Sequence, residues 1–468
     1  MFKILYKWSF IIITVFSIQA QANAKNSDVD LIQQIQSITE EAYIFAYPML
    51  QNYKSLYSRT VLGKKPINVF SHRQKLLGPK FTAIVGPNND TLYSASWLDL
   101  SGGPLVISVP EVEKSRYYSI QLIDMYTHNF AYIGQRSTGS KAGSYVIVGP
   151  NHDLGDLASK YSGVFQSETN FVFAIGRMLA KGSEDEKVAA NLLKQYQLYP
   201  LTPLSDKNIS KLSEELPPYS LDIVQSYKFI ELFNYLLSHV SIHPSEDKLV
   251  SSFSKIGIGA GKTFDMASYS PEIQAAIKAG VKSALSKISA ESKLIGAQVA
   301  GWNTTYLGFG SRNVMQGKYL LRAAAAMIAL YGNDREENSS FSRQVDQKRQ
   351  PLDGSLNDNS SVYTLRFEKG HFPQSDAFWS LTMYRLPEVL LYENEIQRYS
   401  IGDRTKNLNY AEDGSLTFYI QHKAPEGDKL KNWLPAPAGP FALALRTYLP
   451  KPAVYLGEWL PPEVKRVR

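Results

Sequence analysis

Apolar residues recur at every third or fourth position between residues 28 and 57, which is the spacing of one face of an α-helix. Ser27 or Asp28 can act as the N-cap, because a short polar side chain accepts a hydrogen bond from the first turn. Pro48 lacks a backbone N–H, so we expect it to kink or end this helix. The apolar positions are Leu31, Ile35, Ile38, Ala42, Phe45 and Met49.

The chain then changes to short runs that are rich in β-branched and aromatic residues and are separated by Gly, Pro, Asn and Asp. Such runs are typical of strands, and their regular spacing predicts a small antiparallel sandwich. The predicted strands are Phe81–Val85, Thr91–Leu98, Leu105–Val109, Tyr117–Met125, Phe130–Gly134 and Tyr145–Val148.

The helical period returns in the middle of the chain, and the strand pattern resumes from Val362. Between them, the polar and punctuated stretch Asn333–Asn359 predicts a linker. Strands, then helices, then strands indicate an α+β protein with several domains rather than a wound α/β sheet. The predicted helices are Glu184–Tyr196, Leu221–Val240, Asp247–Ile256, Pro271–Gln298 and Lys318–Tyr331. The predicted C-terminal strands are Val362–Phe367, Phe378–Tyr384, Leu416–Gln421 and Phe441–Tyr448.

The first 24 residues have the organisation of a secretory signal peptide. Lys3 and Lys7 supply the positive start, Trp8–Ile18 is an apolar run, and Ala22 and Ala24 form a cleavage site. The alternative is a membrane anchor, but this run falls well short of the roughly 20 residues that span a bilayer. We expect export to the periplasm or beyond, cleavage near Ala24 and no stable membrane anchor.

The composition removes several classes of site. The chain has no cysteine, which excludes disulfides, zinc–thiolate sites and a cysteine nucleophile. His239 and His243 have the spacing of two metal ligands on one helical face, but Pro244 disfavours helical geometry at His243. We therefore expect no metal and no cofactor. The net charge of +7 is thinly spread, so we expect no nucleic-acid partner, while a homo-oligomer stays open.

The first candidate site combines the segment Asn88–Tyr93 with the strand that follows Arg116. Alternation along this strand places Asp124 on the same face as Ile120 and Leu122, where an unpaired carboxylate would be costly. Asp124 is thus a candidate catalytic acid or base, with Asp90 or Asp99 as the second carboxylate.

A structural interpretation of the same residues is the alternative. In it, Asn89 and Asp90 build a turn through their side chains, and Asp124 pairs with Arg116 or caps a loop. In this constellation we also take Asn89, Tyr93 and Arg116 as ligand-binding candidates.

The second candidate site is rich in aromatic residues and arginine near the C-terminus. Trp379, Tyr384, Trp433 and Arg404 could stack on a sugar and grip an anion. The same residues also suit a seam between domains that contains a buried arginine–aspartate network.

These motifs resemble two bacterial families. Residues 88–93, with Trp97, Asp99, Gly103 and Arg116–Tyr118, resemble domain of unknown function 1254. A set of later segments resembles its usual partner, domain of unknown function 1214: Tyr319, Arg322, Leu352–Gly354, Phe378–Ser380, Arg398–Arg404 and Asn432–Pro437. The resemblance implies an N-terminal immunoglobulin-like β-sandwich, a helical middle and a C-terminal jelly-roll-like β-sandwich. It implies no reaction and no catalytic residue.

We divide the chain into a signal peptide at 1–24, an N-terminal helix and sandwich at 25–180, a helical region at 181–335 and a C-terminal sandwich at 336–468. The leading hypothesis is an exported protein that binds a small molecule or glycan at a polar-aromatic pocket near the domain junction. The alternatives are a cofactor-free hydrolase with paired carboxylates and a structural envelope protein without a ligand.

Overall fold

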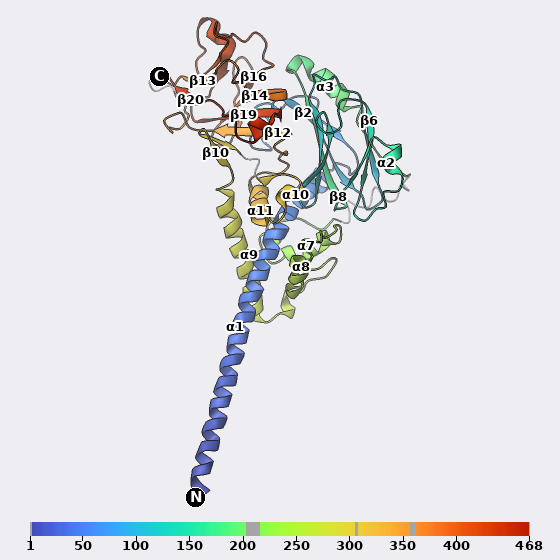
Figure 1. The fold of residues 1–468 in the computed structure, drawn as a ribbon, viewed down its shortest axis with the longest axis vertical. Helices are drawn as coiled ribbons and strands as arrows, with labels where there is room; N and C mark the ends of the chain where they lie inside the picture. Colours follow the sequence, from blue (N-terminus) through green and yellow to red (C-terminus); the bar gives the residue numbers. More distant parts are fainter. Residues whose placement is uncertain (1, 203–215, 305–307, 356–360, 468) are drawn as a thin grey trace.

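The chain forms two β regions that lie side by side above a group of helices (Figure 1). A computed structural model describes residues 2–202, 216–304, 308–355 and 361–467. The side chains of residues 1–28, which include the predicted signal peptide, lie outside the described part. This α+β architecture, with a helical middle and a C-terminal β region, agrees with the fold class that the sequence predicts.

Helix α1, Phe2–Tyr57, provides the apolar face that organises the helical core. The periodic residues from Ile35 to Met49 are buried, as their spacing predicts. Pro48 lies inside the helix and does not end it. Phe45 and Tyr53, on the two sides of Pro48, are both buried in the same core, so tertiary packing holds the helix through the proline. A π-helical turn, Ser58–Leu62, follows.

Two sheets share the N-terminal β core. The first sheet has the order β1-β2-β8-β4-β5 and is antiparallel throughout, and the second has the order β7-β6-β3-β9. The first contains β1 Ser71–His72, β2 Thr91–Asp99, β8 Phe171–Leu179, β4 Tyr118–Asp124 and β5 Asn129–Gly134. The second contains β7 Gly163–Gln166, β6 Gly143–Val148, β3 Leu105–Val109 and β9 Gln197–Pro200. Leu92, Ile120 and Leu122 from the first sheet pack with Leu105 and Ile147 from the second.

The strand predicted at Phe81–Val85 is wrong. Phe81 and Thr82 have no regular secondary structure, residues 83–85 form bends, and Ile84 and Val85 are 52% and 65% exposed. Their β-branched side chains favour extended backbone, but no neighbouring strand pairs with them, and β-propensity is realised only on a half-buried, paired surface.

The helices of the middle region cover the face of the first sheet that points away from its sandwich core. Trp97, Ile123 and Phe173 from the sheet join the helical core. The helices beyond α1 are α2 Leu157–Lys160, α3 Glu186–Leu193, α6 Leu221–Val224, α7 Phe229–Leu237, α8 Asp247–Ser252, α9 Pro271–Ser292, α10 Arg312–Met315, α11 Tyr319–Ile328 and α12 Pro452–Tyr455. Short 3-10 turns lie at Ser183–Asp185, Phe253–Ile256, Met266–Ser268 and Gly427–Asn432.

Two predicted helices differ from the structure. Leu221–Val240 is divided into α6 and α7, and Ser220 caps α6 through its side chain. Helix α9 ends at Ser292, and Ala297–Val299 forms strand β10 instead of extending the helix. Pairing with β11 decides this segment, because a ladder of hydrogen bonds outweighs the weak local preference for helix.

Two further sheets enclose the C-terminal core. The larger has the order β10-β11-β12-β19-β14-β15, with β16 also paired to β14, and the smaller has the order β18-β17-β13-β20. The larger contains β10 Ala297–Val299, β11 Trp302–Thr304, β12 Asn338–Arg343, β19 Phe441–Pro450, β14 Ser375–Arg385, β15 Leu390–Leu391 and β16 Ser400–Gly402. The smaller contains β18 Trp433–Pro435, β17 Leu416–Gln421, β13 Tyr363–Phe367 and β20 Val464–Arg466.

The predicted linker Asn333–Asn359 contains a strand. Strand β12 pairs with β19 over its whole length, from Asn338–Tyr448 to Arg343–Leu443. Three serines make the segment polar, but Ser340 and Ser342 lie on the face of the sheet opposite the buried Phe341. A strand with only one apolar face carries a weak sequence signal.

Candidate functional site

Asp90 lies directly before β2 and joins the N-terminal region to the C-terminal sheet. Its side chain is only 1% exposed. Its Oδ1 accepts a hydrogen bond from Arg404 Nη2 at 2.6 Å, and its Oδ2 accepts one from Ser380 Oγ at 2.7 Å. Ser380 is in β14 and Arg404 follows β16, so both donors come from the C-terminal sheet. The structure therefore brings the predicted residues Asp90 and Arg404 together in the manner of the seam interpretation.

Arg404 lies between two carboxylates. Its Nε is 3.8 Å from Asp403 Oδ1, and its Cζ is 4.0 Å from the centre of the Phe378 ring. Burial raises the pKa of Asp403 to about 6, although the neighbouring Arg404 lowers it. Asp403 is not among the predicted site residues, although it lies in the segment Arg398–Arg404 that carries the family resemblance.

The two carboxylates considered as a catalytic pair lie at opposite ends of the first sheet. The carbonyl of Asp90 accepts a hydrogen bond from Ala180 N, just beyond the end of β8, whereas Asp124 pairs with Val172 near the beginning of β8. At roughly 3.3 Å per strand residue, about 25 Å separates them. Asp99 binds the backbone N–H of Ser101. This separation argues against a hydrolase that pairs Asp124 with Asp90, because two cooperating carboxylates lie within about 10 Å of each other.

Asp124 is only 1% exposed, as strand alternation predicts, and it closes a turn with His128. Its Oδ1 accepts a hydrogen bond from the backbone N–H of His128 at 2.8 Å, and its Oδ2 is 3.2 Å from His128 Nδ1. Burial and the nearby Arg322 lower the pKa of His128 to about 4, so its ring is neutral at neutral pH. Asp124 does not pair with Arg116, which binds Asp185 at 2.5 Å instead.

Two arginines from separate helices complete a buried charge cluster around Asp124. Arg322 is 3% exposed and donates from Nη2 to the carbonyl of Tyr126. Burial lowers the pKa of Arg322, and the charge of Asp124 opposes this. Arg312 forms ion pairs with Glu168 and with Glu246, the latter at 3.0 Å. We define the buried charge cluster as Asp124, His128, Glu168, Glu246, Arg312 and Arg322.

Sequence reasoning missed most of this cluster. Glu168, Glu246 and Arg312 lie far from Asp124 along the chain and belong to no short motif. Arg322 entered only through the family resemblance. Glu168, at 30% side-chain exposure, is the most exposed of these side chains, so the cluster is built as an internal support rather than an open site.

The remaining predicted residues of the first site are engaged by the protein itself. Asn89 donates from Nδ2 to the carbonyl of Leu77 at 2.5 Å, while the side chain of Asn88 closes the turn by accepting from Asp90 N. Arg116 is 3% exposed and binds Asp185 and Glu113. Tyr93 is half-buried, and the guanidinium of Arg177 lies 5.9 Å from its ring centre.

The three aromatic residues of the second site have separate positions. Trp379 is 4% exposed and packs between Phe367 and Phe418 in the C-terminal core. Tyr384 is 2% exposed and donates from its hydroxyl to the carbonyl of Pro87 at 2.8 Å. Trp433 is 3% exposed and donates from Nε1 to the carbonyl of Gln421. The structure does not gather these rings around one ligand, and of the three only Trp433 lines one of the pockets described next.

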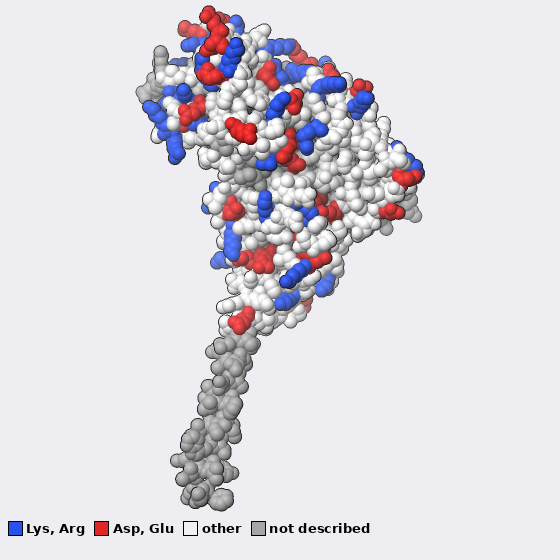
Figure 2. All heavy atoms as spheres, viewed as in Figure 1, with Lys and Arg blue, Asp and Glu red and all other residues white. Residues whose placement is uncertain are grey.

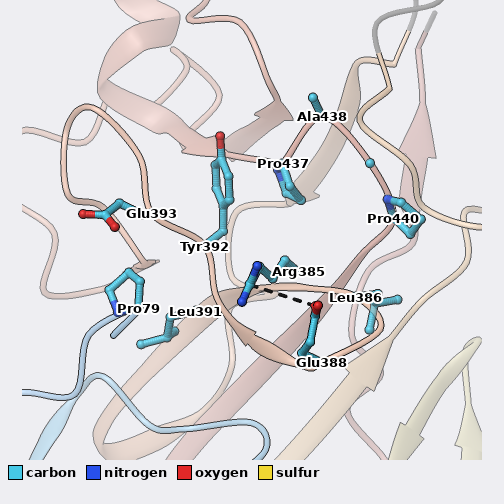
Figure 3. A pocket seen from close by; sticks show the side chains of 11 residues that line it. Pro79, Arg385, Leu386, Glu388, Leu391, Tyr392, Glu393, Pro437, Ala438 and Pro440 are labelled. Atoms are coloured by element: carbon cyan, nitrogen blue, oxygen red, sulfur yellow. Dashed lines mark ion pairs between the residues drawn. The ribbon is translucent and has the colours of Figure 1, made fainter. Parts of the chain in front are cut away.

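A pocket of about 480 Å³ opens where the C-terminal sheet meets the loop that contains Pro79 (Figure 3). The ring of Tyr392 stands between Glu393 and Pro437, and Arg385 and Glu388 approach each other below it at 4.0 Å. Leu391 also lines the pocket and packs on Tyr384, so the buried Tyr384 supports the pocket from beneath.

A second pocket, of about 580 Å³, adjoins the first. It shares Tyr392 and Glu393 with the first, and Trp433 also lines it. The ring of His422 is 6.4 Å from that of Tyr392, and Asn394, Glu395 and Lys423 add polar groups. We call the two pockets together the Tyr392 groove.

Charged residues of both signs are interspersed over the face of the molecule that Figure 2 shows. Within the described residues, no group of three or more His, Asp or Glu side chains is arranged to hold a metal ion. No helix in that part of the chain combines the length and the apolar character needed to cross a membrane.

Two family models match the chain in the predicted order. Residues 67–200 match protein of unknown function (DUF1254), and residues 337–452 match protein of unknown function (DUF1214). The search of curated proteins finds no match. Among solved structures, the VPA0106 protein from Vibrio parahaemolyticus is similar at 26% identity, with a TM-score of 0.74 over 93% of this chain and 100% of that chain. The structure of an uncharacterized protein from Burkholderia cenocepacia aligns at 10% identity with a TM-score of 0.43, over 95% of this chain and 98% of that chain.

Proposed function

We propose that this chain, which carries a DUF1254 domain followed by a DUF1214 domain, both of unknown function, is an exported protein that binds a small molecule or glycan in the Tyr392 groove. This places the ligand near the junction of the two regions, since Pro79 from the N-terminal side lines the groove.

The shape and chemistry of the groove support this proposal. Each of its two pockets falls within the roughly 300–1,000 Å³ of small-molecule sites. The half-buried ring of Tyr392 offers an apolar face, and Glu393, Glu395 and His422 supply acceptors and donors around it. Sugars need this combination, because their C–H faces pack on aromatic rings while their hydroxyls form hydrogen bonds.

Calorimetric titration with neutral and acidic oligosaccharides tests the ligand class. We expect at least one of them to bind the parent, and we expect Tyr392→Ala to weaken it about tenfold, the loss of ~1.4 kcal/mol. Tyr410→Ala is the matched control, because Tyr410 is 50% exposed and is not among the residues that line the groove. Equal weakening by both variants, or no binding by any oligosaccharide, would leave the structural envelope protein as the better account.

Export rests on the leader described above, residues 1–24. Signal peptidases recognise small residues such as Ala22 and Ala24, so the mature protein begins at Lys25. N-terminal sequencing of the protein from the periplasmic fraction tests this, and material that begins at Met1 contradicts it.

The finer architecture is part of the proposal. The two N-terminal sheets share one core, which supports an immunoglobulin-like sandwich, and the two C-terminal sheets share another, which supports a jelly-roll-like sandwich. Strand β9 pairs with β3, so we place the end of the N-terminal domain after Pro200 rather than at residue 180. The likeness to the VPA0106 protein supplies an experimental structure against which to compare both sandwiches.

A further inference from the structure

Two arginines occupy the outer faces of the two central sheets. Arg177 in β8 pairs with Tyr93 and Ser119, and its neighbour Met178 points into the N-terminal core. Arg446 in β19 pairs with Ser340 and Ser380, and its neighbour Leu445 points into the C-terminal core. Because successive residues of a strand point to opposite faces, both arginines lie on the faces away from these cores.

These two faces meet where the N-terminal β region contacts the C-terminal β region, which we call the seam. The rings of Tyr117 and Tyr448 are 5.1 Å apart, and Asn88 donates from Nδ2 to the Tyr448 hydroxyl at 2.5 Å. Arg446 donates from Nη2 to the carbonyl of Gly86 at 3.0 Å. Burial and the charge of Asp90 raise the pKa of Tyr448, while the charges of Arg446 and Arg177 lower it, so both guanidinium groups and the Asp90 carboxylate lie near this one hydroxyl.

Neither guanidinium forms an ion pair with a carboxylate of the described residues. Arg177 donates to the side-chain oxygens of Gln121 and Asn333 at 2.7 and 3.1 Å, and Arg446 donates to Thr382 Oγ1 at 3.1 Å. These acceptors are neutral, so they satisfy hydrogen bonds without cancelling charge. A buried charge that lacks a counterion is costly.

The carboxylates of the seam are already engaged. Asp90 binds Arg404 and Ser380, as described above. Glu337 accepts from Arg136 Nε at 2.6 Å and from the Tyr117 hydroxyl. Asp334 accepts from Asn129 Nδ2 at 2.8 Å, and burial raises its pKa to about 6. Asp90 also lies near Arg446, whose pKa it raises against the effect of burial, but no carboxylate of the described residues is at ion-pair distance from Arg177 or Arg446. Both guanidinium groups can therefore take an oxyanion that comes from outside the chain.

Tyr93 adds a donor at the same place. Its ring lies 5.9 Å from the Arg177 guanidinium, and its hydroxyl has no hydrogen bond to any described residue. Tyr93 and Arg446 both keep partial exposure, so the seam is not sealed around them.

We propose that Arg177, Arg446 and Tyr93 form a binding site for the carboxylate or phosphate group of a small anionic molecule. Guanidinium groups suit such a ligand, because their N–H groups donate in pairs to two oxygens of one oxyanion. This site is separate from the Tyr392 groove and does not depend on the proposed function, since none of the three residues lines the groove.

Calorimetric titration with inorganic phosphate and with succinate, at constant ionic strength set by sodium chloride, tests the site. We expect one of the two to bind the parent saturably, and its identity separates a phosphate from a carboxylate ligand. Arg446→Gln should weaken that binding at least about tenfold, because a hydrogen bond to a charged group is lost. Arg366→Gln is the control, since Arg366 is a surface arginine that pairs with Glu368 and Asp413, and it should bind as the parent does.

Thermal melting without added anion gives an independent result. Removal of a partly buried charge that has no ion-pair partner should leave the melting temperature of Arg446→Gln at or above that of the parent, whereas a supporting role would lower it clearly. Tyr93→Phe keeps the ring and removes only the free hydroxyl, so it should melt as the parent does and bind the anion more weakly. The proposal is overturned if neither probe binds the parent, if both variants bind like the parent, or if Arg446→Gln melts well below it.

Discussion

At the scale of single residues, buried carboxylates in this protein are stabilised by donors that the fold brings to them. Asp124 accepts a hydrogen bond from the backbone N–H of His128 at 2.8 Å. The neutral ring of His128 and the charge of Arg322 also lie near its carboxylate. Thr127, in the same turn, has a φ of 72°, a left-handed conformation that is rare for a β-branched residue. The surrounding charge cluster holds this turn in place, which indicates a supporting role for Asp124.

Asp124→Asn tests that role. Asparagine keeps the acceptor for the His128 N–H but removes the negative charge that offsets Arg322, so we expect a loss of about 3 kcal/mol in the free energy of unfolding. Urea denaturation measures it. Asp153→Asn is the control, because Asp153 also accepts a backbone hydrogen bond, from Gly155, but at the surface. A variant as stable as the parent would show that Asp124 is a strained functional residue instead.

His128 should make stability depend on pH. Its pKa is lowered from 6.5 to about 4 by burial and Arg322, so the unfolded chain binds more protons than the native protein between these values. The part of the free energy of unfolding that depends on neutral His128 is complete above about pH 6.5. It is lost as the pH falls towards 4, by up to about 3 kcal/mol. His128→Asn should therefore lose less stability than the parent between pH 7 and 4, as measured by urea titrations at each pH. Parallel curves for the two proteins would contradict this.

At the scale of elements, the contact between α1 and α9 depends on one glycine. A Cβ on Gly280 would lie 2.6 Å from the carbonyl oxygen of Gln36 and 2.6 Å from the Cβ of Thr39, both in α1. The two helices therefore approach more closely here than any other residue would allow. The hydrophobic faces of both helices are buried in the same core, so a small separation affects many contacts.

Gly280→Ala should destabilise the protein by about 1–3 kcal/mol, although alanine favours a helix over glycine by roughly 1 kcal/mol, because overpacking against a rigid backbone outweighs propensity. Thermal melting followed by far-UV circular dichroism measures the change. Ser286→Ala on the exposed face of α9 is the control and should melt close to the parent. If Gly280→Ala melts higher than the parent, the close approach does not constrain the helices.

At the scale of the whole molecule, the Asp90–Arg404 pair joins residues 314 positions apart and couples the N-terminal region to the C-terminal sheet. Tyr384 and Tyr448 add hydrogen bonds from the same sheet to Pro87 and Asn88 in the loop before Asp90. These bonds tie one short loop to three positions on the sheet, so the seam should resist opening until the protein unfolds.

Arg404→Ala tests this coupling. It leaves the 1% exposed Asp90 without its charged partner, so we expect a loss of about 3 kcal/mol and faster cleavage at the seam in limited proteolysis. Arg366→Ala, which breaks an exposed ion pair, should leave the stability close to that of the parent. Equal effects of the two substitutions would mean that the seam is held by apolar packing alone.

The sequence by itself determined the elements whose patterns are local and strong. The buried face of α1 from Ile35 to Met49 follows from a period of 3.6, and the strand Leu416–Gln421 follows from a period of 2. The strand Leu105–Val109 follows from a short, nearly continuous apolar run. The order of the two family domains also followed from motifs of consecutive residues.

Only the tertiary structure decided which chemistry-bearing residues meet. Asp90 and Asp124 belong to the same sheet but lie at its opposite ends. Asp90 forms an ion pair with Arg404, whereas the charge of Asp124 acts on Arg322. Strand β12 formed inside a polar stretch because β19 pairs with it, and Phe81–Val85 did not form a strand because nothing pairs with it. Strand pairing and charge compensation depend on partners that are distant along the chain, and local patterns do not specify those partners.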